Sequence, residues 1–227
     1  VPKVESVDAT PGFRVECGDG NEPMNLRGVI FDLDGTLLDT IEDLTDSMNI
    51  ALARMGCPRR SVAECRHLVG DGLATFVRRA LPEDRRGDPE AAARLNELMR
   101  AEYRLRSMAK TRPYPGIEDL LDDLARRGTP MAILSNKPQD STLIVVRHYF
   151  PSRPFKPVFG ARDGVPVKPD PAGALEIARE WGLAPEAIAY LGDTNTDMRT
   201  ATAAGMFACG ALWGFRTAEE LAANGAR

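Results

Sequence analysis

The segment Val29-Ile30-Phe31-Asp32-Leu33-Asp34-Gly35-Thr36-Leu37 decides the fold of this 227-residue chain. Its Val, Ile and Phe residues are typical of a strand buried in a parallel sheet, and the two aspartates follow where that strand leaves the sheet. Side chains two positions apart share one face of a strand, so Asp32 and Asp34 can point to one place. Two carboxylates at one place repel each other unless a cation or a shared proton relieves the repulsion. The segment therefore predicts a buried parallel strand that ends in a functional acidic pair.

The chain on either side of this strand changes its pattern twice. Apolar residues recur at helical spacing between residues 41 and 112. From Pro113 onward, short apolar strands alternate with helices, which is typical of a parallel sheet covered by helices. The predicted strands are 131–134, 157–159, 188–191 and 207–211, and the predicted helices are 117–127, 140–149, 171–181 and 197–204.

These patterns predict an α/β protein with a doubly wound, Rossmann-like parallel sheet and an inserted all-helical domain. The α/β core would comprise residues 24–40 and 113–227, and the helical insertion residues 41–112. Residues 1–23 mix Pro, Gly, Asp and Glu with little periodicity, which predicts a flexible N-terminal extension.

Composition excludes several classes of function. The formal net charge of -4 gives no broad attraction to nucleic acid or to an anionic membrane, and no apolar run is long enough to span a bilayer. The four cysteines form no CxxC pair, which predicts reduced thiols in a cytoplasmic protein. An anionic substrate would need local help from Lys, Arg or a metal ion. The sequence leaves open whether the chain is a monomer or a homodimer.

Polar side chains follow three of the predicted strands, and a fourth group lies in a proline-rich loop. In an open parallel sheet, ligands bind beyond the carboxyl ends of the strands, so these residues are expected to meet there. Three acids, one lysine and small hydroxyl or amide donors suit a hard divalent cation bound together with a phosphate group. The residues are Asp32 and Asp34, Ser135 and Asn136, Asp193, and Lys168 in the loop.

These motifs, in this order, resemble the haloacid dehalogenase superfamily of phosphatases. The resemblance is carried by Asp32-Leu33-Asp34-Gly35-Thr36, Ser135, Lys168 and Gly192-Asp193-Thr194-Asn195-Thr196-Asp197. Within the superfamily the chain resembles the phosphoglycolate phosphatase group, on shorter stretches that related phosphatases share in part. These are Leu38-Asp39-Thr40, Val69-Gly70-Asp71-Gly72, Ser135-Asn136-Lys137-Pro138 and Trp213-Gly214-Phe215-Arg216.

The resemblance implies a role for each motif. Asp32 would be the nucleophile that forms an aspartyl phosphate, and Asp34 the general acid and base. Mg²⁺ would be bound by the Asp32 carboxylate, the Asp34 backbone carbonyl and the Asp193 carboxylate. The remaining assignments are Asp197 as a support of the metal's water shell, and Thr36, Ser135, Asn136 and Lys168 as ligands of the phosphoryl group. An acid at the position of Asp34 favours phosphate esters, because dehalogenases of this superfamily lack it.

The implied activity is Mg²⁺-dependent hydrolysis of a small phosphorylated metabolite, with 2-phosphoglycolate as the first substrate to test. The helical insertion would be a cap that closes over the site, with Gly70, Asp71 and Gly72 as a substrate loop. Arg66, Arg78 and Arg79 are candidates to bind a substrate carboxylate, and the sequence does not choose among them.

Two other hypotheses stay open on the sequence. A phosphatase for nucleotides or sugar phosphates, or a phosphosugar mutase of the same superfamily, would share most of these motifs. A phosphorylatable switch that resembles a receiver domain would also carry a metal-bound acidic cluster in an α/β fold, but receivers have no helical insertion after the first strand.

Overall fold

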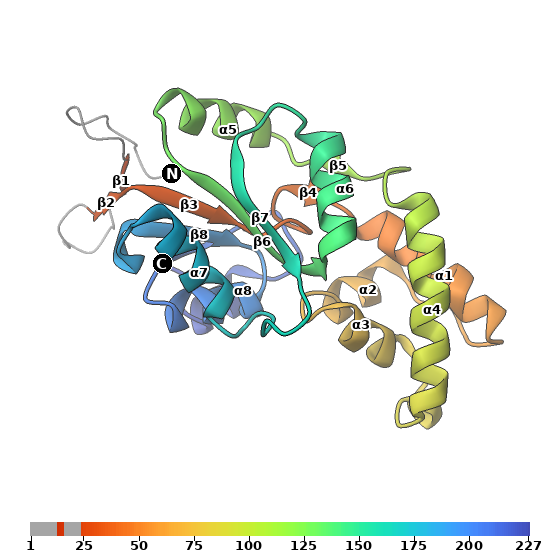
Figure 1. Cartoon of the computed structure of the whole chain (residues 1–227). Coiled ribbons are helices and arrows are strands. Elements are labelled where there is room, and N and C mark those ends of the chain that lie inside the picture. Colours follow the sequence, from red (N-terminus) through yellow and green to blue (C-terminus); the bar gives the residue numbers. More distant parts are fainter. Residues whose placement is uncertain (1–12, 16–23) are drawn as a thin grey trace.

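Five parallel strands form the central sheet of the computed structural model (Figure 1), which describes residues 13–15 and 24–227. Their order across the sheet is β7-β6-β3-β8-β9. The strands are β3 (Gly28–Phe31), β6 (Met131–Pro138), β7 (Phe155–Ala161), β8 (Ile188–Gly192) and β9 (Phe207–Gly210). The decisive apolar segment is thus the middle strand, paired on both edges.

The middle strand is apolar on both faces because both faces of the sheet are covered by helices. Val29 and Phe31 point to one hydrophobic cluster, and Ile30 points to the other. One layer contains α5 (Ile117–Arg126) and α6 (Gln139–Tyr149), and the other contains α7 (Ala172–Trp181) and α8 (Asn195–Ala203), as Figure 1 shows. The predicted doubly wound α/β fold is confirmed, and a further helix, α9 (Ala218–Ala223), follows the last strand.

A helical insert occupies the space beyond the carboxyl ends of the strands (Figure 1). It consists of α1 (Ile41–Arg54), α2 (Val62–Leu68), α3 (Leu73–Ala80), the short 3-10 helix η1 (Glu83–Arg85) and α4 (Pro89–Arg106). Its apolar faces form a separate hydrophobic cluster that also takes in Phe215 from the core. A capping box begins α2, with the Ser61 side chain accepting from the backbone N–H of Glu64.

The chain leaves and re-enters the core at one narrow junction. Strands β4 (Leu38–Asp39) and β5 (Arg112–Pro113) pair antiparallel there. The buried Asp43 carboxylate, in the first turn of α1, accepts hydrogen bonds from the backbone N–H groups of Lys110 and Thr111 and from the Thr111 hydroxyl. A buried carboxylate with several donors holds its partners firmly, so both ends of the insert are fastened to each other.

Strand β6 is longer than the sequence predicts. The prediction ends at Leu134, whereas the strand continues to Pro138 and its register with β7 shifts between Leu134 and Pro138. Ser135 and Asn136 therefore lie inside an irregular strand end rather than in a loop after it. The apolar pattern stops at Leu134 because the side chains beyond it face the site described below.

Before the middle strand, β1 (Phe13–Val15) pairs antiparallel with β2 (Met24–Leu26). The rest of the predicted N-terminal extension lies outside the described residues. No helix in the described part of the chain combines the length and the apolar character needed to cross a bilayer.

Candidate active site

Three carboxylates meet at the carboxyl ends of the two middle strands. Asp32 directly follows β3, and Asp193 directly follows β8. Asp197 comes from the first turn of α8, where it forms a capping box with Thr194. All three side chains are buried, and one carboxylate oxygen from each lies within 4.8 Å of the others. Of the three acids expected to meet at this edge, Asp32 and Asp193 lie in the cluster, and its third member is Asp197 rather than Asp34.

One lysine joins this cluster from a distant loop. The buried Lys168 ammonium lies 2.7 Å from Asp32 Oδ1 and 2.7 Å from Asp197 Oδ1. Burial alone would lower the pKa of Lys168, but the charges of Asp197 and Asp32 outweigh burial and raise it well above its usual value. Lys168 therefore stays charged, and three acids share a single ammonium group.

That imbalance of charge opposes ionisation of the acids. Burial and the charge of Asp197 raise the pKa of Asp32 to about 7, although Lys168 acts in the opposite direction. Burial and the charge of Asp32 raise the pKa of Asp193 well above its usual value. A second cation in the cluster would relieve both effects, so the site has the electrostatic character of a cation-binding site.

The hydrogen bonds show which oxygens are available to a cation. The two Asp197 oxygens accept three short bonds, from the Lys168 ammonium at 2.7 Å and from the Thr194 N–H and hydroxyl at 3.0 and 2.6 Å. The Tyr190 hydroxyl lies 3.5 Å from Asp197 Oδ1 and 3.4 Å from the Leu134 carbonyl oxygen, and its single proton can serve only one of them. Asp193 accepts only two, one from the Thr36 hydroxyl at 3.0 Å and one from the Phe215 N–H at 2.8 Å. Asp32 accepts one among the described residues, from Lys168.

Carboxylate oxygens with vacant lone pairs are the ligands that Mg²⁺ prefers, so the donor set of this site fits that ion. Asp32 and Asp193 have the capacity to bind it directly. Asp197 has its oxygens engaged and instead holds Lys168 and the start of α8 in place.

Two glycines make room for the Asp193 carboxylate. Gly35 has a φ of +93°, a backbone conformation that side chains disfavour, and a Cβ there would overlap the Asp193 carboxylate. A Cβ at Gly214 would overlap Asp193 from the other side. The turn after Asp34 and the loop after β9 thus pack directly against this acid.

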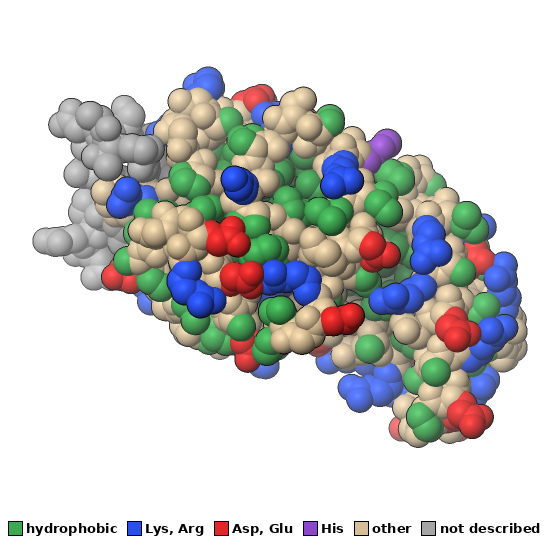
Figure 2. All heavy atoms as spheres, viewed as in Figure 1, with side chains coloured by type: hydrophobic (Ala, Val, Ile, Leu, Met, Phe, Trp, Pro, Cys, Tyr) green, Lys and Arg blue, Asp and Glu red, His purple; other side chains and the backbone are tan. Residues whose placement is uncertain are grey.

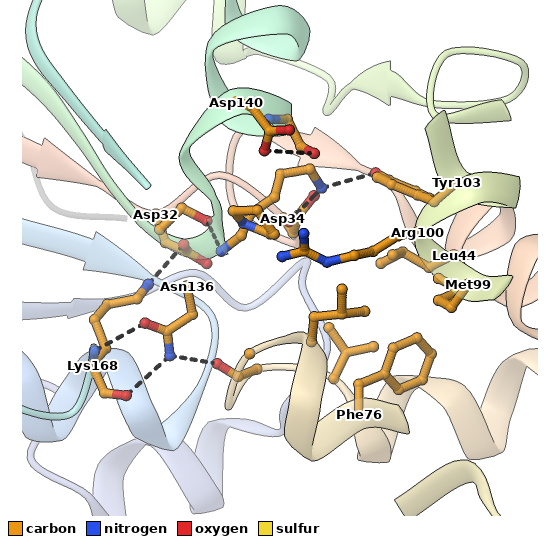
Figure 3. Close-up of a pocket in the computed structure, with 18 of the residues that line it drawn as sticks. Asp32, Asp34, Leu44, Phe76, Met99, Arg100, Tyr103, Asn136, Asp140 and Lys168 are labelled. Carbon is orange, nitrogen blue, oxygen red and sulfur yellow. Dashed lines mark hydrogen bonds and ion pairs between the residues drawn. The ribbon is translucent and has the colours of Figure 1, made fainter. Parts of the chain in front are cut away.

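Asp34, the second acid of the pair, does not lie in the three-carboxylate cluster. Both of its oxygens lie 2.8 Å from the Lys137 ammonium at the end of β6. The same ammonium lies 2.8 Å from the hydroxyl of Tyr103 on α4, so a chain of contacts runs from Asp34 to the insert (Figure 3). Burial lowers and Asp34 raises the pKa of Lys137, with a net rise, and burial raises the pKa of Tyr103 to about 12.

The predicted phosphate ligands differ in how far their side chains are free. The Ser135 hydroxyl accepts from the Lys137 N–H at 3.2 Å, which leaves its own proton available to a ligand. The Asn136 side chain is engaged at both ends, because its amide donates to the carbonyls of Lys168 and Gly70 and its oxygen accepts from the Lys168 N–H. The Thr36 hydroxyl is directed to Asp193. Asn136 and Thr36 thus hold neighbouring parts of the site in place.

The predicted substrate loop lies at the border between insert and core. Gly70 and Gly72 line the pocket beside Asn136. Asp71 forms an ion pair of 2.7 Å with Arg79 and accepts a hydrogen bond from the Thr196 hydroxyl of α8. The structure therefore brings the loop to the site, although the Asp71 carboxylate has its partners at the rim.

Arg216, in the loop between β9 and α9, binds the chain just before this substrate loop to the core. Its buried guanidinium donates to the carbonyl oxygens of Arg66, His67 and Val69, where α2 ends. The last carbonyls of a helix have no partners within the helix, so a cation at this position satisfies them.

The pocket has two unlike sides. The core side is polar and carries Asp32, Asp34, Ser135 and Lys168. The insert side is largely apolar, with Leu73, Phe76 and Met99 among its residues, and it also carries Arg100 and Arg104 of α4 (Figure 3). Such a pocket suits a small molecule with its charged group against the core.

The arginines predicted for a substrate carboxylate do not occupy the pocket. Arg66, Arg78 and Arg79 are absent from its lining, and Arg79 is paired with Asp71. The residues that the sequence analysis missed are Lys137, Tyr103 and Arg100. Lys137 directly follows the Ser135-Asn136 pair, a signal that was available, whereas the orientation of α4 depends on tertiary packing.

Comparison with known proteins agrees with this geometry. The model of the haloacid dehalogenase-like hydrolase family matches residues 29–211. A curated relative from Pseudomonas aeruginosa, phosphoglycolate phosphatase 1, is 34% identical over 200 residues, which are 86% of this chain and 73% of the relative. A phosphoglycolate phosphatase of Yersinia pestis is 30% identical over 200 residues, 88% of this chain and 86% of the relative.

Solved structures show the same fold. A crystal structure from Lactobacillus delbrueckii subsp. bulgaricus, of a protein for which phosphoglycolate phosphatase activity is predicted, superposes with a TM-score of 0.84 at 30% identity. The match covers 90% of this chain and 93% of that one. A crystal structure from Bacteroides fragilis, described as a haloacid dehalogenase-like hydrolase, gives a TM-score of 0.81 at 25% identity, and the match covers 89% of this chain and 95% of that one.

Proposed function

This chain belongs to the haloacid dehalogenase-like hydrolases and is a phosphatase of that family, and we propose that it hydrolyses 2-phosphoglycolate with bound Mg²⁺. The observation that carries the proposal is the position of Asp32, which faces the pocket with vacant lone pairs while Lys168 holds its other oxygen. A receiver-like switch does not agree with membership in a hydrolase family or with the helical insert.

In the first step, an Asp32 oxygen attacks the phosphorus atom of the substrate. A phosphorus–oxygen bond to Asp32 forms, the ester bond breaks, and Asp34 gives a proton to the leaving oxygen. Ser135 and Lys168 bind the phosphoryl oxygens, where negative charge gathers during the transfer. The products of this step are an aspartyl phosphate and the free alcohol.

In the second step, water attacks the phosphorus atom of the aspartyl phosphate. Asp34, now ionised, takes a proton from that water, and the bond between phosphorus and the Asp32 oxygen breaks. Inorganic phosphate leaves, and Asp34 returns to its protonated state. Lys137, which contacts both Asp34 oxygens, orients this carboxylate in both steps.

Mg²⁺ would be held by the Asp32 and Asp193 carboxylates and by the backbone carbonyl of Asp34, with Asp197 as a support. When bound, it supplies positive charge that offsets the charge of the phosphoryl group and of the acids. Asp193 is kept in position for this role by the Thr36 hydroxyl and the Phe215 N–H.

The helical insert, residues 41–112, would serve as a cap over the α/β core of residues 24–40 and 113–227. Its contacts with the core through Tyr103, Gly70 and Asp71 support this assignment, because they surround the pocket on the insert side. A closed cap excludes bulk water from the aspartyl phosphate until the alcohol has left.

The proposal is tested with the Asp32→Asn variant. Asparagine keeps the size of the side chain but is a poor nucleophile, so turnover of 2-phosphoglycolate should fall by about 10⁴-fold or more while the circular dichroism spectrum is unchanged. Phosphate release is the measurement, with a panel of sugar and nucleotide monophosphates beside 2-phosphoglycolate.

EDTA should abolish phosphate release by the wild type, and added Mg²⁺ should restore it. Full activity of Asp32→Asn would reject Asp32 as the nucleophile. A kcat/KM that is higher for a sugar or nucleotide phosphate would reject 2-phosphoglycolate as the substrate. Phosphoryl transfer to a sugar instead of water would identify a mutase.

A further inference from the structure

We infer that Arg100 of α4 binds the carboxylate end of the substrate, opposite the end that carries the phosphoryl group. This inference rests on the proposed function and deepens it, because it assigns the residue that selects a phosphomonoester with a carboxylate group. Figure 3 shows Arg100 extending from α4 into the middle of the pocket, toward the side on which Asp34 lies.

The first support is the charge of the pocket. Four cationic side chains line it, and two of them have acidic partners: Lys168 pairs with Asp32 and Asp197, and Lys137 pairs with Asp34. Arg100 and Arg104 have neither a hydrogen bond nor an ion pair with any residue in the described part of the chain. The insert therefore brings uncompensated positive charge to a pocket of an acidic protein.

The acids of the pocket do not account for this charge. Asp32 and Asp34 are held by the two lysines. The third acid of the lining, Asp140 at the start of α6, accepts from the N–H and hydroxyl of Ser141. Asp140 has no basic partner among the described residues, so one unpaired acid stands against two unpaired arginines, and the positive charge left over suits a ligand with an anionic group.

The second support is the surroundings of the guanidinium. Leu44 and Met99 lie beside Arg100, and Leu73 and Phe76 complete the apolar side of the pocket (Figure 3). Arg100 is an exposed residue, so water screens its charge in part, but the apolar side chains beside it make this screening weaker than in open water. A carboxylate also matches the planar fork of a guanidinium, which can donate two parallel hydrogen bonds to it.

The third support is the direction of the substrate. With phosphorus at Asp32, the leaving oxygen must lie near Asp34, and the rest of the molecule then extends toward the insert. In 2-phosphoglycolate the carboxylate is two bonds from that oxygen. The carboxylate of such a small acid would then face the side of the pocket that carries Arg100, whereas a neutral phosphate ester of the same size leaves Arg100 without a partner.

The experiment compares two substrates that differ only in this end group. We would measure kcat/KM at fixed Mg²⁺ for 2-phosphoglycolate and for 2-hydroxyethyl phosphate, whose end is neutral, with the wild type, Arg100→Met, Arg100→Lys and Arg94→Met. Arg94 is the matched control, since it lies on the same helix, pairs with Glu97 and does not line the pocket.

We expect Arg100→Met to lower kcat/KM for 2-phosphoglycolate by about 10- to 100-fold, mainly through KM, and to change the value for 2-hydroxyethyl phosphate by less than about 2-fold. Arg100→Lys should recover part of the loss. Arg94→Met should leave kcat/KM for both substrates unchanged, and the two Arg100 variants should keep the wild-type melting temperature because Arg100 has no partner to lose.

An equal loss on both substrates would overturn the inference, as would no loss on either, while the proposed function would stand if the wild type prefers 2-phosphoglycolate. A wild type that hydrolyses 2-hydroxyethyl phosphate as well as 2-phosphoglycolate would overturn both. A preference of Arg100→Met for the acidic substrate equal to that of the wild type would assign the selection to another residue.

Discussion

Asp32 lies where burial and a neighbouring carboxylate both oppose its ionisation, yet a nucleophile must be ionised to attack phosphorus. The pKa of Asp32 is about 7 in the absence of a metal ion, against 3.8 for a free side chain. Lys168 offsets only part of this rise. A divalent cation beside Asp32 and Asp193 would lower both pKa values, so it would favour the ionised form that the proposed nucleophile needs and would relieve the repulsion among the acids.

This raised pKa has a consequence for stability. The folded chain holds the Asp32 proton up to about pH 7 and the unfolded chain only to about pH 4, so the folded state binds more protons in between. The stabilisation of the folded state by this bound proton is fully present below the pKa of Asp32 in the unfolded chain and is lost as pH rises through its pKa in the folded chain. Without metal, we expect the free energy of unfolding to fall across this window, by about 4 kcal/mol at most from Asp32.

Mg²⁺ should reverse that trend. Its ligands must be deprotonated, so it should raise the melting temperature more at about pH 8 than at about pH 5. Calorimetry with and without Mg²⁺ at both pH values is the measurement, and Asp193→Asn, which removes a proposed ligand, is the control that should lose the Mg²⁺ response. An equal Mg²⁺ effect at both pH values would contradict the assignment of the ion to these acids.

At the scale of elements, the end of α2 and the loop after it are held by side chains of the core. Three core residues donate hydrogen bonds to them. Arg216 donates to the last carbonyls of α2, the Asn136 amide to the Gly70 carbonyl, and the Thr196 hydroxyl to the Asp71 carboxylate. The protection of the loop amides from exchange should therefore depend on contact between the insert and the core.

Replacing Arg216 by Met should release this loop. The guanidinium donates to three carbonyls, and hydrogen bonds of charged groups each contribute about 1.5–3 kcal/mol, so amide exchange over residues 66–72 should become faster and KM should rise. Hydrogen exchange read by mass spectrometry checks this. Arg199→Met is the control, because Arg199 contacts Asn224 and no residue of the insert. Unchanged exchange over residues 66–72 would show that Asn136 and Thr196 suffice.

At the scale of the whole molecule, the hydrophobic interior formed by the described residues is divided into three clusters. Two lie on the faces of the sheet, and the third belongs to the insert and includes only Phe215 from the core. On the face seen in Figure 2, acidic and basic side chains alternate over the core, which agrees with a small net charge and local rather than broad attraction of the substrate.

The separate cluster predicts a separate opening reaction. We expect amides of α1–α4 to exchange through a common opening whose free energy is lower than that of β3, β6 and β8, because the insert shares little apolar surface with the sheet. Native-state hydrogen exchange in low denaturant is the measurement. Phe215→Ala should lower the free energy of the insert opening more than that of the sheet. A single free energy for all protected amides would show that insert and core open together.

Much of this architecture could be predicted from local pattern. The apolar run of β3, the alternation of strands and helices after Pro113, and the helical spacing of residues 41–112 each report on one periodicity, and each is present in the structure. The meeting of Asp32, Asp193 and Lys168 could be predicted too, because carboxyl ends of parallel strands share one edge. The structure differs from the prediction at the end of β6. The strand continues past its apolar residues to Pro138, and the Asn136 side chain binds two loops instead of being free for a ligand.

What the sequence by itself determined is the order of the elements and the residues that stand at the ends of the strands, since both follow from spacing along one chain. Only the tertiary structure decided which partner each side chain has: Lys137 with Asp34, Asp197 with Lys168, and Arg100 rather than Arg66, Arg78 or Arg79 in the pocket. The physical reason is that these partners come from segments far apart in sequence, and that the rotation of α4 about its axis depends on its packing against other helices. No periodicity within a single segment records that packing.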